Sequence, residues 1–287
     1  MPQPEVTQQT VLPARNYNLQ ATLTSGQAFR WQATPSGWEG VIGQNWVRLA
    51  QHEDGIHAET TARSTDWNWL RSYLQTDIDL EPILQSFPKD SPMQRSVAAC
   101  PGLRLLRQDP WECLASFILS STKQIVQIRQ IVNLICQRFG ARLPAPRTSA
   151  PVNAFPSPDS IANATEQALR DCRMGFRAPN LLNTARLVVD NKVTLARLHQ
   201  LDIPQARAEL LQCPGVGQKI ADCVLLFACG FQSAFPVDVW ISKALTRLYF
   251  PNRRPTRARL ERFLATHFGP NAGYAQQYLF HFARKTL

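Results

Sequence analysis

Two residues of this chain have side chains that could do covalent chemistry together. Lys219 stands in the stretch CPGVGQKIADC, and Asp238 stands further along in FPVDVW. A lysine attacks only as the neutral amine, and the positive end of a helix dipole favours that form in a first helical turn. Lys219 is therefore a candidate nucleophile, although it could instead contact a phosphate or stay solvated. Asp238 could be a catalytic carboxylate or the N-cap of the following helix.

The segment around Lys219 is predicted to be a helix-hairpin-helix arrangement. One helical run, PQARAELLQC, ends at Pro214, and a second, IADCVLLFACG, ends near Gly230, with a Gly-Val-Gly turn between them. N–H groups at the start of the second helix suit a phosphate. A P-loop is excluded, because that motif has a different spacing and follows a strand. The residues expected to contact DNA here are Gly215, Val216, Gly217 and Gln218.

The elements that must position these residues change character once along the chain. Up to about residue 60, the runs AFRWQ, WEGVI and WVRLAQ are separated by the turn signals TPSG, GQN and EDG, as is typical of antiparallel strands. From about residue 66 the pattern is helical. We therefore predict an α+β fold, in which a small N-terminal antiparallel β domain with following helices (1–108) precedes an all-helical helix-hairpin-helix domain (109–287).

Local signals also predict where one helical segment begins and ends. Asp109 followed by Pro110 offers an N-cap and a proline at the first helical position. Further on, Gly140 is placed to end a helix. The segment 143–160 contains five prolines and is predicted to be a loop. The apolar face of the helix before this loop is formed by Ile128, Ile131, Val132 and Ile135.

Composition narrows the class of partner. The chain has 287 residues, 44% hydrophobic content and a net charge of +10, which favours a packed protein that binds a polyanion, above all nucleic acid. The seven cysteines show no metal-ligand spacing, which predicts reduced, mostly buried thiols and no metal site. No signal peptide or membrane span is predicted, so an intracellular protein is expected.

A hairpin lysine followed by an aspartate in Pro-Val-Asp resembles the helix-hairpin-helix (HhH-GPD) DNA glycosylase superfamily. The resemblance extends along most of the chain to the 8-oxoguanine DNA glycosylase/AP lyase family, whose segments occur here in the family's order. They are SGQAFRW (25–31), DPWECLASFILSS (109–121), GFRA (175–178), CPGVGQKIADC (213–223), PVDV (236–239) and AGYAQQYLF (272–280). The resemblance implies a monomeric enzyme without cofactors that excises oxidised guanine from double-stranded DNA.

The chemistry that this family implies agrees with the two residues. Departure of a flipped base leaves positive charge on the sugar at C1′, which Asp238 would stabilise. The neutral amine of Lys219 would bond to C1′ and open the sugar to a Schiff base, which acidifies the C2′ proton and allows β-elimination of the 3′ phosphate. The scheme requires no metal or redox cofactor, and it leaves open a structural cation on the hairpin carbonyls.

The resemblance also implies a pocket for the flipped base. Gly26 matches the family glycine whose carbonyl accepts a hydrogen bond from N7–H of 8-oxoguanine, a proton that guanine lacks. Gln276 matches the residue that reads the base edge, and Phe280, four residues later on the same helix face, matches the stacking aromatic. Cys223 is expected to cover the opposite side of the base. Without the resemblance, Phe280 and Cys223 would be interpreted as core residues and Gly26 as part of a turn.

Other expected DNA contacts depart from the family's pattern. Thr122 stands where the family usually has asparagine and Gln127 where it has arginine, and both family residues contact the cytosine left in the opposite strand. Arg177 is retained from that set, and Phe176 replaces the tyrosine that wedges into the gap. Trp240 replaces a histidine that commonly follows the aspartate. These five positions are expected on the DNA-binding surface.

Two other classes of protein stay open. A monofunctional glycosylase for alkylated purines keeps the aspartate but has no hairpin lysine, so Lys219 argues against it. A non-catalytic helix-hairpin-helix DNA-binding protein needs neither Asp238 nor the pocket residues. The lack of basic targeting tails favours a bacterial protein of the cytoplasm or nucleoid.

Overall fold

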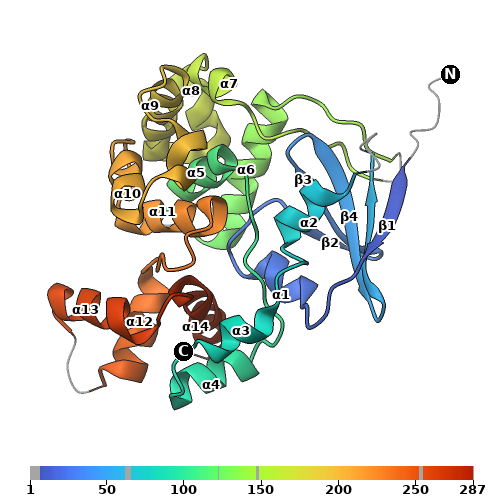
Figure 1. Ribbon diagram of the computed structural model, residues 1–287. Coiled ribbons are helices and arrows are strands. Elements are labelled where there is room, and N and C mark those ends of the chain that lie inside the picture. Colours follow the sequence, from blue (N-terminus) through green and yellow to red (C-terminus); the bar gives the residue numbers. More distant parts are fainter. Residues whose placement is uncertain (1–6, 62–65, 122, 147–148, 252–254, 287) are drawn as a thin grey trace.

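The computed structural model describes residues 7–61, 66–121, 123–146, 149–251 and 255–286. Thr122, one of the predicted cytosine contacts, lies outside these ranges. The N-terminal part contains one five-stranded antiparallel sheet in the order β1-β5-β4-β3-β2 (Figure 1). Its strands are β1 (Gln8–Leu12), β2 (Gln32–Thr34), β3 (Gly37–Ile42), β4 (Asn45–His52) and β5 (Gly55–Thr60). The predicted antiparallel N-terminal part of an α+β fold is confirmed.

Two tight turns set the register of this sheet. Ile42 pairs with Asn45, and His52 pairs with Gly55, so the hairpins β3–β4 and β4–β5 each have a two-residue turn, where GQN and EDG predicted turns. The apolar side of the sheet shares one core with the helices α1 (Leu19–Thr24) and α2 (Asn68–Leu74). Members of that core include Leu12, Leu19, Leu23, Val47, Leu49, Ile56, Leu70 and Leu74.

The prediction that AFRWQ is a strand was wrong for most of that run. Only Gln32, its last residue, belongs to β2. Trp31 is buried instead, and its Nε1 donates a hydrogen bond to Tyr73 Oη at 2.9 Å. An extended segment that fills a core has the same apolar pattern as a short strand. The fifth strand is β1, which pairs with β5 at the opposite edge.

The rest of the described chain is mainly helical, as predicted (Figure 1). The helices after α2 are α3 (Leu80–Gln85), α4 (Ser91–Ala98), α5 (Pro110–Leu119), α6 (Ile125–Phe139), α7 (Pro158–Ala162), α8 (Glu166–Leu169), α9 (Ala178–Val189), α10 (Ile203–Leu211), α11 (Gln218–Val224), α12 (Val239–Tyr249), α13 (Arg257–His267) and α14 (Ala272–Thr286). Short 3₁₀ or π-helical turns cover Arg170–Met174, Gly175–Arg177, Leu195–Gln200 and Leu225–Cys229.

Both predicted ends are confirmed, but the segment between them is two helices and not one, because α5 ends at Leu119 and α6 begins at Ile125. The Asp109 carboxylate accepts a hydrogen bond from Glu112 N at 2.8 Å, and α5 begins at the next residue. Helix α6 ends immediately before Gly140, but the reason for glycine differs from the one expected. Its φ of −87° suits any residue, whereas a Cβ would lie 2.0 Å from Ala154 O. The glycine therefore makes room for the proline-rich loop, which returns past the end of α6.

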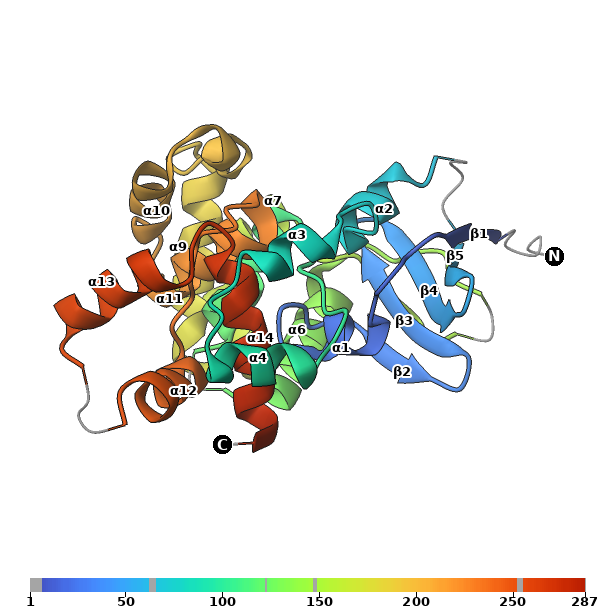
Figure 2. The same ribbon diagram turned by 60° about the horizontal axis from the view of Figure 1, so that its bottom comes forward.

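Helix α14 runs through the helical part and packs against α12 and α4 (Figures 1 and 2). Residues from α3 and α4 enter the same core as α14, and the rings of Phe87 and Tyr278 meet edge to face at 5.8 Å. Part of the segment before residue 109 thus packs with the helices that follow it. The division of the chain into the domains 1–108 and 109–287 stays a prediction.

The predicted helix-hairpin-helix arrangement is formed by α10, α11 and the turn between them. Gly215 has a φ of +78°, and a Cβ there would lie 2.4 Å from Asn180 Nδ2, so both backbone conformation and space require glycine. Arg207 Nε of α10 donates to Asp222 Oδ1 of α11 at 2.8 Å. This partly buried ion pair ties the two helices together and holds the start of α11, where Lys219 lies.

Candidate active site

A cleft of about 1100 Å³ lies where the hairpin, the start of α12 and the connection between α5 and α6 come together. Lys219 and Asp238 both line it. The structure therefore brings the two chemistry-bearing residues into one cavity. The other lining residues are Ser120, Ser121, Lys123, Gln124, Gly215, Gly217, Ile220, Val237, Val239, Trp240, Ser242, Lys243, Thr246 and Arg247.

Lys219 is the second residue of α11 and is half-buried. Its Nζ donates a hydrogen bond to Ser120 Oγ at 3.2 Å and lies 5.0 Å from the centroid of the Phe117 ring. Both partners belong to the C-terminal end of α5. The amine therefore has a defined position at the wall of the cleft, unlike a freely solvated lysine.

Asp238 is the N-cap of α12, one of the two roles expected for it from the sequence. Its Oδ1 accepts a hydrogen bond from Ile241 N at 2.8 Å. Burial raises the pKa of this carboxyl group, while backbone N–H groups and the charge of Lys219 oppose the rise. The carboxylate is thus poorly hydrated and within electrostatic reach of the amine. A positive charge that forms beside it is stabilised more strongly than in water.

Cys223 lies one helical turn after Lys219 and is buried. Burial raises the pKa of its thiol to about 12, with Lys219 lowering and Asp238 further raising it. The thiol is therefore protonated at neutral pH and does not compete as a nucleophile. Cys223 is not among the residues that line the cleft, and its place in a pocket wall stays a prediction.

Gly26 and Phe280 come from opposite ends of the chain and meet in space. A Cβ on Gly26 would lie 3.3 Å from Phe280 Cε1 and 3.1 Å from Ile125 Cδ1. The φ of Gly26 is +82°, a conformation that favours glycine. A bare backbone and an aromatic ring are therefore neighbours here, and both can contact a flat ligand.

Within the described residues, only one of the two polar atoms of the Gln276 side chain has a hydrogen-bond partner. The residue is 4% exposed, and its Nε2 donates to Pro236 O at 3.0 Å, two residues before Asp238. Its Oε1 is buried and has no hydrogen-bond partner within the part of the chain that the structure describes. Leaving such an acceptor unpaired costs roughly 1–3 kcal/mol. A ligand that donates hydrogen bonds beside Asp238 could satisfy it.

The four hairpin positions differ in what they offer a partner. Gly215, Gly217 and Gln218 are exposed, whereas the side chain of Val216 is buried. Val216 can therefore contact a partner only through its backbone. The Oε1 of Gln218 also accepts a hydrogen bond from Arg257 at 3.3 Å, which joins the hairpin to α13.

Phe176 and Arg177 are adjacent in sequence but differ in exposure. Phe176 is 60% exposed, as a residue that wedges into DNA must be, while Arg177 is 3% exposed. The guanidinium of Arg177 donates to the carbonyls of Ser121 and Met174 and lies 4.2 Å from the Phe176 ring centroid. Arg177 would have to leave these carbonyls before it could read a base.

Gln127 and Trp240 lie at the surface, on α6 and α12. The Oε1 of Gln127 accepts a hydrogen bond from Gln124 N at 3.1 Å, which caps the start of α6. The Trp240 ring lies 5.2 Å from Lys243 Nζ. This indole borders the cleft next to Asp238, so it can contact a ligand that enters the cleft.

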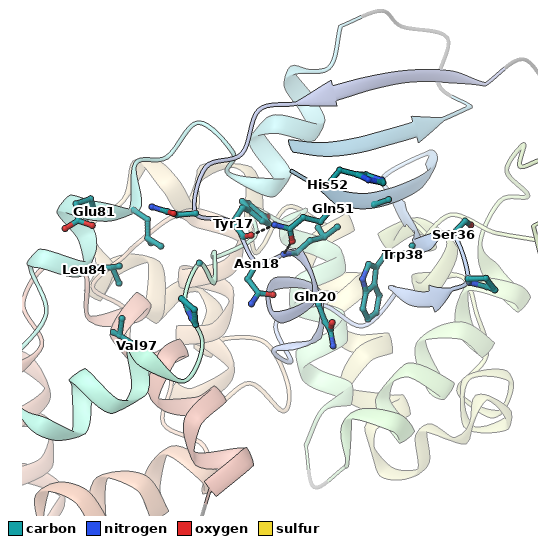
Figure 3. Close-up of a pocket in the computed structure, with 18 residues that line it drawn as sticks. Tyr17, Asn18, Gln20, Ser36, Trp38, Gln51, His52, Glu81, Leu84 and Val97 are labelled. Carbon is teal, nitrogen blue, oxygen red and sulfur yellow. Dashed lines mark hydrogen bonds between the residues drawn. The ribbon is translucent and has the colours of Figure 1, made fainter. Parts of the chain in front are cut away.

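A second hollow, of about 930 Å³, lies between the sheet and the helices α3 and α4 (Figure 3). Gln51 donates to the Tyr17 carbonyl in its wall, as the dashed line in Figure 3 marks. Apart from Tyr17, the ionisable side chains among its described lining residues are His52 on β4 and Glu81 on α3, which are well separated in Figure 3. This hollow offers no amine paired with a carboxylate.

Sequence reasoning missed the residues that hold the site in place. Ser120, which contacts the candidate nucleophile, stands 99 residues before it. Gln277 donates to Ser25 O at 3.0 Å across 252 residues and so fastens the loop that carries Gly26. Ser120 and Gln277 both lie in segments that resemble the glycosylase family, which was the one signal available for them.

Three further findings concern partners and cofactors. No helix within the described ranges is long and apolar enough to cross a membrane. The same ranges hold no group of three or more His, Cys, Asp or Glu residues placed to bind a metal ion. The seven cysteines are free of disulfide bonds, and all but Cys229 are buried, as expected for reduced thiols.

Comparison with known proteins matches both parts of the chain to described families. Residues 10–114 match the 8-oxoguanine DNA glycosylase N-terminal domain, and residues 115–270 match the HhH-GPD superfamily of base excision DNA repair proteins. An N-glycosylase/DNA lyase OGG1 of Arabidopsis thaliana is 30% identical over 91% of this chain and 76% of its own length. A probable N-glycosylase/DNA lyase of Methanothermobacter thermautotrophicus is 28% identical over 96% of both chains.

The fold agrees with these matches. The 8-oxoguanine glycosylase/lyase of Clostridium acetobutylicum, in complex with double-stranded DNA containing cytosine opposite 8-oxoguanine, superposes with a TM-score of 0.87. It is 28% identical, and the match covers 96% of this chain and 98% of that one. This chain therefore belongs to the 8-oxoguanine DNA glycosylase family within the HhH-GPD superfamily of base excision DNA repair proteins.

Proposed function

We propose that this protein is a bifunctional DNA glycosylase and AP lyase that excises 8-oxoguanine from double-stranded DNA. The observation that carries the proposal is the presence of Lys219 and Asp238 in one cleft. The names of the relatives support it, since they are N-glycosylase/DNA lyases and an 8-oxoguanine glycosylase/lyase bound to DNA. The net charge of +10 suits a DNA ligand.

The first step is loss of the damaged base from a nucleotide that has been flipped into the cleft. The bond between C1′ and the base breaks, and its electron pair leaves with the base. Positive charge develops on the sugar, and the poorly hydrated Asp238 carboxylate stabilises it. Because Asp238 is fixed as the cap of α12, the carboxylate does not have to reorganise during the reaction.

The second step is covalent capture by Lys219. Its Nζ, placed by Ser120 and Phe117, forms a bond to C1′. The C1′–O4′ bond then breaks as a proton passes from Nζ to O4′, which leaves the opened sugar as a Schiff base. The Schiff base withdraws electrons from C2′, so a C2′ proton is lost. The electron pair left behind forms a double bond between C2′ and C3′ as the C3′–O bond breaks and the 3′ phosphate leaves. The strand is thereby cut on the 3′ side of the damaged nucleotide.

We propose that the base is held by Gly26, Cys223, Gln276 and Phe280. Phe280 stacks on one face of the base, and the Cys223 thiol covers the other. The Gly26 carbonyl accepts the N7–H of 8-oxoguanine, which guanine lacks. The unpaired Oε1 of Gln276 accepts a hydrogen bond from the base edge, which removes the penalty of an unsatisfied buried acceptor.

Around this pocket, the exposed hairpin N–H groups are proposed to bind the DNA backbone, with Phe176 filling the space left by the flipped nucleotide. Trp240 borders the cleft and would contact the damaged strand. The similar proteins come from a bacterium, an archaeon and a plant, so they do not point to one kind of source organism. A bacterial cytoplasm or nucleoid is the location that we propose, in line with the Clostridium acetobutylicum enzyme among the similar structures.

The direct test is strand cleavage of labelled duplexes that contain either 8-oxoguanine or an alkylated purine. We expect cleavage of the 8-oxoguanine duplex without alkali. Cleavage only after hot alkali would indicate a monofunctional glycosylase. Cleavage of the duplex with the alkylated purine, but not of the one with 8-oxoguanine, would show that the alkylated purine is the substrate. Binding of both duplexes without base release would indicate a non-catalytic DNA-binding protein.

Replacing Gly26 with alanine is expected to reduce 8-oxoguanine excision by at least tenfold. The φ of +82° alone makes a side chain unfavourable by about 1–2 kcal/mol, and the new Cβ would press on Phe280 and Ile125. Gly43→Ala is the matched control, because Gly43 has a φ of +58° and a Cβ there would meet no described atom within 4 Å beyond its chain neighbours. Both variants should lose stability in thermal unfolding, Gly26→Ala more than Gly43→Ala because of these contacts, but only Gly26→Ala should lose excision in single-turnover assays.

Excision is expected to depend weakly on the base opposite the lesion. Gln127 uses its Oε1 as a helix cap, and an uncharged amide penalises a wrong base less than a guanidinium does. Arg177 is occupied by backbone carbonyls. Single-turnover rates on duplexes with cytosine, thymine, guanine or adenine opposite 8-oxoguanine should therefore differ by less than about 100-fold, the size of one good polar contact.

The Gln127→Arg, Thr122→Asn double variant should raise the preference for cytosine. Gln130→Arg is the control, since Gln130 is also exposed on α6 and gains the same charge. The Gln130→Arg variant should change the excision rates on all four duplexes by the same factor. A wild-type cytosine preference of several hundredfold would show that other residues read the opposite base.

A further inference from the structure

Two arginines lie next to the proposed base pocket and take no part in the scheme above. Arg129 is on α6, four residues after Ile125, and Arg284 is on α14, four residues after Phe280. Ile125 and Phe280 are the side chains that close over Gly26. Because residues four apart share a helix face, each arginine lies one turn beyond that contact. Both arginines therefore lie near the residues that close over Gly26, and Arg129 also lines a separate hollow of about 500 Å³ between α6 and the strands β2 and β3.

Arg284 is exposed, and its guanidinium lies near the Phe280 ring. Its Cζ lies 5.5 Å from the centroid of the Phe280 ring. Burial and the nearby charge of Arg129 lower the pKa of Arg284, while the charge of Asp238 raises it. Arg284 is therefore within electrostatic reach of both the second arginine and the catalytic carboxylate.

The charge of Asp238 reaches Arg284, but among the described residues no carboxylate is in contact with either arginine. Within the described residues, neither Arg129 nor Arg284 forms an ion pair, and Arg129 Nε is buried without a hydrogen-bond partner. Two arginines elsewhere in this protein are paired, Arg30 with Glu112 at 3.5 Å and Arg207 with Asp222 at 2.8 Å, whereas Arg107 is partly buried and forms no ion pair within the described residues. Two like charges held together without an anion repel each other, so binding of an anion between them is favoured.

We infer that Arg129 and Arg284 bind a backbone phosphate that flanks the flipped nucleotide. The inference rests on the proposed function, which places the sugar of that nucleotide at Lys219 and Asp238. A phosphate carries the full negative charge and the several acceptor oxygens that two guanidinium groups require. A base edge offers neutral acceptors only. The two arginines are therefore positioning residues, which hold the sugar against the nucleophile.

The test combines protein variants with DNA in which one phosphate is made neutral. The probe is a duplex with a tetrahydrofuran abasic-site analogue, which the enzyme cannot cleave, and with a methylphosphonate at the phosphate on either side of the analogue. Removal of a charged hydrogen bond predicts that Arg284→Gln binds the unmodified probe about tenfold more weakly than the wild type. The methylphosphonate at one flanking position should weaken wild-type binding by a similar factor.

The decisive result is the combination of the two changes. If Arg284 contacts that phosphate, the methylphosphonate weakens binding by Arg284→Gln less than it weakens wild-type binding, because only Arg129 is left to contact it, and the losses are not additive. Arg129→Gln should behave in the same way, so the test survives if one variant fails to fold. Arg186→Gln is the control: Arg186 is exposed on α9, and its variant should keep the full sensitivity of the wild type to the methylphosphonate.

Full additivity at both flanking phosphates would overturn the inference. The salt dependence of binding gives a second readout, because the slope of log Kd against log salt should fall by about 0.9 for one lost phosphate contact. Failure of the proposed function is seen separately, as a wild-type protein that does not cleave 8-oxoguanine duplexes. Cleavage by the wild type with additive binding losses would leave the proposed function intact and reject the arginine pair alone.

Discussion

Lys219→Gln is expected to abolish the covalent complex that borohydride traps between this protein and 8-oxoguanine DNA. A Schiff base requires an amine, and a carboxamide nitrogen does not form one. Glutamine can still donate a hydrogen bond toward Ser120, so the local packing should be preserved. The excision rate should also fall by a factor on the order of 10³ or more, as is usual when a nucleophile is removed. Trapping is measured by a mobility shift under denaturing conditions, and excision by single-turnover kinetics.

A second lysine in the same cleft provides the matched control. Lys243 lines the cleft on α12 and lies 5.2 Å from the Trp240 ring. Lys243→Gln should trap as much covalent complex as the wild type does, even if it binds DNA more weakly. Trapping that survives in Lys219→Gln but disappears in Lys243→Gln would transfer the role of nucleophile to Lys243.

Asp238→Asn is expected to slow excision by about 10²–10³-fold, the usual effect of removing one preorganised electrostatic contact. The neutral amide cannot stabilise positive charge at C1′. The variant should leave the stability of the protein nearly unchanged, because asparagine caps helices as well as aspartate does. Single-turnover excision and thermal unfolding therefore separate the two roles of this residue. Affinity for DNA should stay the same or increase, since a negative charge near phosphates has been removed.

Another helix cap serves as the control for Asp238. Asp202 caps α10 in the same way, by accepting a hydrogen bond from Gln205 N at 2.8 Å. Asp202→Asn should change neither excision nor stability. Asp238→Ala, which removes cap and charge together, should lose about 1 kcal/mol of stability as well as activity. If Asp238→Asn excises 8-oxoguanine at nearly the wild-type rate, Asp238 is a structural cap alone.

Most local features of the fold could be predicted from the sequence, because they depend on residues a few positions apart. Asp109 and Pro110 start α5, and Gly215 permits the hairpin turn. Two-residue turns join β3, β4 and β5 where turn signals occur. Where local pattern and packing compete, prediction failed: the AFRWQ run looks like a strand, but the size of Trp31 favours burial against Tyr73.

The candidate site was predicted as a set of residues, and resemblance to a family contributed most of that set. Spacing alone indicated a helix-hairpin-helix with a lysine and a possible helix cap. It could not show that Gly26 lies against Phe280, or that Ser120 contacts Lys219, since these contacts join segments far apart in the chain. Contacts of this kind depend on how whole helices pack, which no local pattern encodes.

The sequence by itself determined the hairpin that presents Lys219, the position of Asp238 at the start of a helix that it can cap, and the family to which the chain belongs. Only the tertiary structure decided which groups are left unsatisfied, because a missing partner can be recognised only when all neighbours are in place. The buried Oε1 of Gln276 and the unpaired guanidinium groups of Arg129 and Arg284 are of this kind. Each is an ordinary polar residue in the sequence, and its place near the proposed base pocket makes it a candidate contact for DNA.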